Sequence, residues 1–178
     1  MHRRQVVRYL GAALALPFLP RNADAAIQLG EELHLRLLGE EVPFRTLNAR
    51  QQKLVTEIAE FIIPQTDTPG ATSVKVPEFI DLILTEWMSD DEKAAFLSGL
   101  DAIDAKGFAN LSREGKTTLL TAFDKTRNDK TGAGHAFGRL KSLTVYGYFT
   151  SAPVQQDILK TEVMFDSYQG NVPFTPAT

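Results

Sequence analysis

The side chains of this sequence that could do acid–base chemistry are mostly carboxylates. Three are consecutive, at Asp90–Glu92, and two more lie three positions apart, at Asp101 and Asp104. Two carboxylates facing each other across a cleft can act as acid and base. The first group directly follows Ser89, which is typical of the acidic start of a helix, and the second pair is expected on a solvent-facing side. Neither group predicts a catalytic site.

Residues for metal, thiol or nucleotide chemistry are scarce as well. The chain has no cysteine and three histidines, which excludes disulfides, thiolate metal sites, cysteine nucleophiles and covalent C-x-x-C-H attachment of haem. His34 and His135 lie far apart in the sequence, and the Gly132–Gly134 run follows no predicted strand, so phosphate binding is not indicated. We therefore expect no catalytic, cofactor-binding or metal-binding residue in this chain, and no activity of its own.

Net charge and composition narrow the class of partner. The 178 residues are 43% hydrophobic and carry a net charge of −3, which is typical of a globular protein rather than a disordered one. The basic residues are scattered and are not interleaved with aromatic ones, so binding to nucleic acid is not expected.

The elements that would position these side chains are helices. Apolar residues recur at helical spacing in six segments, which begin at Asn48, Pro77, Ser89, Ser112, His135 and Pro153. Gln51 and Glu92 complete capping boxes with Asn48 and Ser89. Trp87 is expected on the apolar side of its helix, and 128–134 is expected to be a polar loop. The pattern predicts an all-α fold: a compact helical domain with an extended C-terminal tail.

The N-terminus has the layout of an export signal. Arg3 and Arg4 precede an apolar stretch from residue 9 to residue 19, and Ala23 and Ala25 form a small-x-small cleavage pattern. The paired arginines are typical of a twin-arginine signal, although an ordinary signal for unfolded chains is the alternative. We predict an export signal over residues 1–25, an N-terminal segment and connector over 26–46, a helical domain over 47–178, and a periplasmic location.

Aromatic residues gather late in the chain. Three occur within Tyr146–Ser151, and two more within Tyr168–Phe174. These rings either complete the core or form a protein-binding surface, because Tyr and Phe are favoured at the centre of interfaces. The sequence leaves both alternatives open.

Several of these segments carry a family resemblance. Ile62–Ala71, Leu140–Ser151 and Tyr168–Gly170 occur in the order and spacing of a known signature. They resemble the gluconate 2-dehydrogenase subunit 3 family, from Leu47 to Phe174. One difference is that this chain has no cysteine, so no disulfide can join it to a partner.

The resemblance implies a small, non-catalytic subunit. In such complexes a large subunit of the glucose–methanol–choline type holds FAD and oxidises a sugar, sugar acid or polyol. A multihaem cytochrome c subunit often passes the electrons on to the membrane, so contact with the membrane would be indirect. The small subunit would assist maturation and export of the flavoprotein. The candidate partner-contact residues are Thr66, Asp67, Pro69, Gly70, Tyr146, Tyr148, Tyr168 and Gly170.

Two other functions remain open on the residues alone. One is a stand-alone periplasmic helical domain that binds a ligand or a protein. The other is an enzyme that uses the scattered carboxylates.

Overall fold

The computed structural model describes residues 43–160, and this part of the chain is helical without any strand. The helices are α3 (Ala49–Ile62), α4 (Val76–Glu86), α5 (Asp90–Asp104), α6 (Arg113–Lys125) and α7 (Gly132–Thr150), with a 3-10 turn η1 (Phe108–Asn110) and a π-helical turn η2 (Val154–Ile158). The predicted all-α class is confirmed. The predicted export signal with Arg3, Arg4, Ala23 and Ala25, and the tail with Tyr168 and Gly170, lie outside the described residues.

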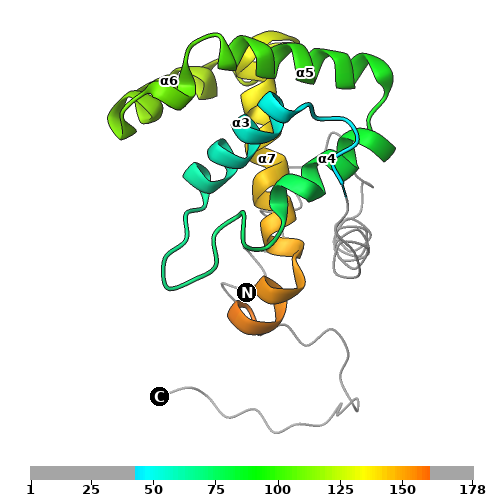
Figure 1. Cartoon of the computed structure of the whole chain (residues 1–178), viewed down its shortest axis with the longest axis vertical. Coiled ribbons are helices and arrows are strands. Elements are labelled where there is room, and N and C mark those ends of the chain that lie inside the picture. The colour runs from blue at the N-terminus through cyan, green and yellow to red at the C-terminus, as the bar shows by residue number, and fades with distance from the viewer. Residues whose placement is uncertain (1–42, 161–178) are drawn as a thin grey trace, which may run out of the picture.

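Helix α7 is the centre of the domain. It runs through the middle of the bundle and contacts α3, α4, α5 and α6, as Figure 1 shows. Its buried side chains include Phe137, Leu140 and Leu143, which meet Phe79 from α4 and Phe96 from α5 in one hydrophobic core. Because the other four α-helices of residues 43–160 all pack on α7, its position determines where the loops between them lie.

The helix starts agree closely with the caps expected from the sequence. Asn48 with Gln51, and Ser89 with Glu92, form both halves of a capping box, and the Ser112 hydroxyl accepts the Gly115 N–H. The helix predicted from Pro77 begins one residue earlier, at Val76. These caps are local hydrogen bonds, so nearby residues suffice to predict them.

The start of α7 was predicted wrongly. The sequence predicts a loop up to Gly134, but the helix begins at Gly132. A Cβ on Gly134 would lie 2.0 Å from Thr126 Oγ1, and a Cβ on Gly99 would lie 2.4 Å from the Ala136 Cβ. The glycines therefore allow close helix packing, and that packing outweighs their low helix propensity.

The position of Trp87 also differs from the prediction. Its side chain is 46% exposed, although its spacing places it on the apolar face of the preceding helix. The helix ends at Glu86, and Trp87 has φ −121°, so its side chain leaves the helical stripe.

Asp81 ties the segment before α3 to α4. Its buried carboxylate accepts the backbone N–H groups of Arg45 (2.7 Å), Thr46 (3.0 Å) and Leu47 (2.7 Å). Within residues 43–160, no helix combines the length and the hydropathy needed to cross a bilayer.

Candidate functional site

The loop between α3 and α4 is held by one carboxylate. Glu60, near the end of α3, accepts the N–H of Gln65 through Oε1 at 2.8 Å. Its Oε2 accepts the N–H of Thr72 at 3.0 Å and the Thr72 hydroxyl at 2.7 Å. Both ends of the segment 65–72 are therefore fastened to the same side chain. We call this segment the Glu60 loop.

The electrostatics of Glu60 agree with this role. Partial burial by itself raises the pKa of its carboxyl, but the hydrogen bonds from Thr72 and Gln65 outweigh burial and hold the pKa below its ordinary value. The loop is thus stabilised by the charged form of Glu60.

A glycine allows the loop to close over Glu60. A Cβ on Gly70 would lie 2.3 Å from Glu60 Oε1 and 2.7 Å from the Gln65 nitrogen. The Gly70 N–H donates to Gln65 Oε1 at 2.7 Å, and the Ala71 N–H donates to the Ile63 carbonyl at 2.9 Å. The backbone is therefore fixed at its base.

The tip of the Glu60 loop is open to solvent. Thr66 and Asp67 are exposed, Pro69 is half-buried and Gly70 is buried. Thr66 donates its N–H to the Thr68 carbonyl at 3.0 Å, which gives the tip a compact turn. A fixed backbone with exposed polar side chains at its tip is suited to contact another protein, because little entropy is lost when it binds.

Tyr148 connects the aromatic segment to this loop. Its hydroxyl donates to the Pro69 carbonyl at 2.8 Å, and its side chain is buried. Tyr146 is 1% exposed, and its ring centroid lies 5.6 Å from that of Phe79. Both rings are therefore part of the core, which is one of the two alternatives that the sequence left open. A role of these rings in contacting a partner stays a prediction. Among the predicted partner-contact residues, Tyr148 is thus joined to the loop that contains Thr66, Asp67, Pro69 and Gly70.

A groove lies on the outer side of α3, next to the Glu60 loop. Its volume is about 590 Å³. Its lining consists of Lys53, Thr56, Glu57, Glu60 and Phe61 from α3, Pro64 and Thr72 from the following segment, and Arg113 from α6. We call this the outer groove. It shares Glu60 and Thr72 with the loop, so the two form one continuous surface.

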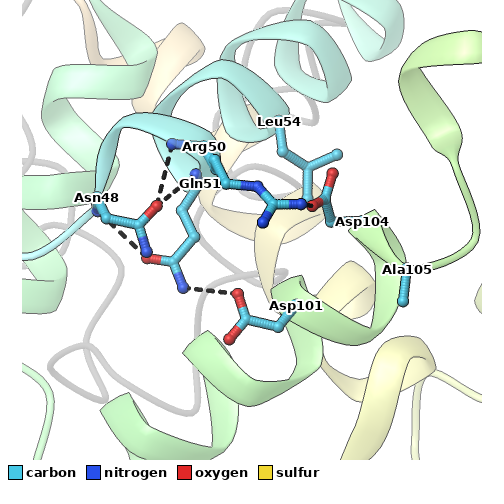
Figure 2. A pocket seen from close by; sticks show the side chains of 7 residues that line it. All are labelled: Asn48, Arg50, Gln51, Leu54, Asp101, Asp104 and Ala105. Atoms are coloured by element: carbon cyan, nitrogen blue, oxygen red, sulfur yellow. Dashed lines mark hydrogen bonds and ion pairs between the residues drawn. The ribbon is translucent and has the colours of Figure 1, made fainter.

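A second hollow, of about 320 Å³, lies between the start of α3 and the end of α5. Figure 2 shows the Arg50 side chain reaching Asp104 and the Gln51 amide reaching Asp101. These contacts measure 2.8 Å from Arg50 Nη2 to Asp104 Oδ2 and 2.9 Å from Gln51 Nε2 to Asp101 Oδ1. The two carboxylates therefore do line a hollow, which the sequence did not suggest. Each is engaged by a donor from α3, so the geometry favours a link between helices rather than acid–base chemistry.

Other residues considered from the sequence lie apart from these surfaces. His135 Nδ1 lies 2.7 Å from the Asp129 carbonyl, at the start of α7. Among residues 43–160, no group of three or more potential ligands could hold a metal ion.

Sequence reasoning missed Glu60 and Asp81. Each carboxylate binds a backbone N–H that is distant in the sequence. Glu60 binds that of Thr72, 12 positions later, and Asp81 binds that of Arg45, 36 positions earlier. No spacing rule connects such pairs. The available signal was weak: an acid near the end of the first helix, and another within an apolar stripe.

Comparison with curated proteins and with solved structures gave no match. The family model described as Gluconate 2-dehydrogenase subunit 3 matches residues 49–164, which include all five described α-helices and the Glu60 loop. The chain therefore belongs to the gluconate 2-dehydrogenase subunit 3 family, a family of small subunits of dehydrogenase complexes.

Proposed function

We propose that this chain is the non-catalytic small subunit of a periplasmic FAD-dependent dehydrogenase complex, and that it assists maturation and export of the flavoprotein subunit. The family match carries this proposal. The N-terminal export pattern supports it, because a twin-arginine pathway moves folded proteins and FAD must be inserted before the flavoprotein crosses.

The partner is a large subunit of the glucose–methanol–choline type. It holds FAD and oxidises a sugar, sugar acid or polyol. A multihaem cytochrome c subunit accepts the electrons, and the complex reaches the membrane through that subunit. This chain has no cysteine for covalent haem attachment, so the proposal assigns the haem to the cytochrome subunit, and it assigns the FAD to the large subunit.

The Glu60 loop is the proposed contact with the flavoprotein. Thr66 and Asp67 stand exposed on a backbone that Glu60 and Gly70 hold in place. A preorganised loop loses little conformational entropy on binding. The exposed tip thus fits a recognition role better than a simple helix connection.

The test is co-export in the native host, with an affinity tag at the C-terminus of this chain. We expect the tagged chain to purify from the periplasmic fraction with a large subunit that contains FAD. The double substitution Arg3→Lys and Arg4→Lys keeps the charge but changes the donor geometry, and should leave both proteins in the cytoplasm. A flavoprotein that is exported with FAD in a strain without this chain would contradict the proposal.

A further inference from the structure

We propose that the outer groove binds a segment of the flavoprotein subunit in which an apolar side chain is flanked by carboxylates. This inference rests on the proposed function and names the chemistry of the contact. It follows from the shape of the groove, its floor and the distribution of charge around it.

One face of α3 forms the wall of the groove. Lys53, Thr56, Glu57 and Glu60 are spaced three and four residues apart, and therefore lie along one side of the helix. Arg113, at the start of α6, and Thr72, in the Glu60 loop, also line the groove. The volume of about 590 Å³ is within the range of pockets that enclose small molecules or peptide side chains.

The floor of the groove is apolar. It contains Phe61, which is half-buried, and Pro64, which is exposed. The Phe61 ring packs edge to face against the buried Phe108 ring, with 6.4 Å between centroids. An apolar side chain of a partner would gain contact with a ring that is already held in place, and a buried anchor of this kind often supplies most of the affinity of an interface.

The negative charges of the groove are already engaged. Glu57 forms an ion pair with Lys116, and Glu60 accepts the hydrogen bonds that hold its loop. The positive charges of Lys53 and Arg113 are not engaged in this way: both side chains are exposed, and neither has an ion pair with a carboxylate of residues 43–160. The rim therefore offers two cations to a bound segment.

Arg113 is also placed over the apolar floor. Its guanidinium carbon lies 5.9 Å from the centroid of the Phe61 ring. A guanidinium held near a ring by cation–π attraction still has N–H donors in its plane that can bind both oxygens of a carboxylate. A segment with an apolar side chain on Phe61 and an acidic residue beside it would satisfy both features.

The continuity of the groove with the Glu60 loop assigns this segment to the flavoprotein. Glu60 and Thr72 belong to both surfaces, so a partner that contacts the loop tip also reaches the groove. Interfaces commonly place an apolar anchor beside a polar, charged rim, and this surface has that arrangement.

Charge reversal in the full complex tests the inference. We expect Lys53→Glu and Arg113→Glu each to weaken the affinity for the purified flavoprotein about tenfold, which corresponds to about 1.4 kcal/mol. Lys130→Glu, which makes the same change of charge at an exposed loop residue away from the groove, should bind like the parent chain. Circular dichroism checks that each variant is folded.

Cross-linking identifies the occupant directly. Because the chain has no cysteine, Thr56→Cys carries a single photoreactive thiol label in the groove and leaves both rim cations in place. We expect it to cross-link to a flavoprotein peptide with an apolar residue next to Asp or Glu. Cross-linking only to residues 161–178 of this chain, or no cross-link within the complex, would overturn the inference.

The two proposals fail in different ways. If the parent chain binds no flavoprotein, the proposed function fails and the groove inference fails with it. If the parent chain binds and both charge-reversed variants bind equally well, only the groove inference is overturned.

Discussion

Replacing Glu60 by glutamine tests whether one carboxylate fixes the loop between α3 and α4. The substitution keeps the shape of the side chain and removes its charge. In the parent, the two oxygens share three donors, from Gln65 and Thr72. An amide has one accepting oxygen and an NH₂ group, so it cannot accept at both ends of the loop. At least one of the fastenings is therefore lost.

The size of the effect follows from these hydrogen bonds. A hydrogen bond to a charged group contributes about 1.5–3 kcal/mol, and the lower figure applies here because Glu60 is only partly buried. A loss of about 1.5 kcal/mol corresponds to a roughly tenfold shift in the opening equilibrium of the loop. The helical core does not depend on this side chain, so the global unfolding should change much less than the loop.

Amide hydrogen exchange measures this opening. We expect exchange at the Gln65 and Thr72 amides to accelerate about tenfold in Glu60→Gln. Glu57→Gln is the matched control: Glu57 lies one turn earlier on α3 and pairs with Lys116 instead of the loop. Unchanged exchange at both loop amides in Glu60→Gln would refute the reasoning.

The loop stability that Glu60 contributes should depend on pH, and comparison of the parent chain with Glu60→Gln tests the direction of that dependence. Because the pKa of Glu60 is lowered from its ordinary value of 4.5, its contribution is fully present above that value. It is lost as the pH falls through the lowered pKa of the folded state. We expect the difference between parent and Glu60→Gln to be constant above pH 4.5 and to disappear only in more acidic solution. A difference that vanished near neutral pH would contradict this.

Two further predictions concern the core. Asp81→Ala leaves three backbone N–H groups at residues 45–47 without their acceptor and should lower the free energy of unfolding by about 3 kcal/mol. Urea unfolding measures this, with the exposed Asp91→Ala as a control expected to cost about 0.5 kcal/mol, and equal losses in the two variants would refute it. Gly147→Ala places a Cβ 2.7 Å from Cδ1 of Phe79 and should destabilise the chain by about 1–3 kcal/mol through overpacking. An unchanged thermal midpoint for this variant would show that the Phe79 ring moves aside at little cost.

Local features of the sequence were enough to place most of the helices. The starts of α3, α5 and α6 follow from Asn48, Ser89 and Ser112, because each cap is a hydrogen bond to a backbone group two or three residues away. Phe96, Leu100 and Ile103 recur at helical spacing after Ser89, and all three are buried in the core. The family resemblance rested on the same local segments, and the family match confirms it.

Tertiary contacts decided the rest. Helix α7 begins before its predicted start because Gly134 lies against Thr126, where a Cβ would not fit, and Trp87 is exposed because its helix ends before it. The surface proposed for the flavoprotein depends on pairs such as Tyr148 and Pro69, which lie 79 positions apart. Periodicity and capping report only on neighbours within about one helical turn, whereas these pairs meet only when α7 packs against α3 and α4. The sequence by itself therefore determined the helices and the family, and the packing of those helices determined the Glu60 loop, the outer groove and the charges that remain available at its rim.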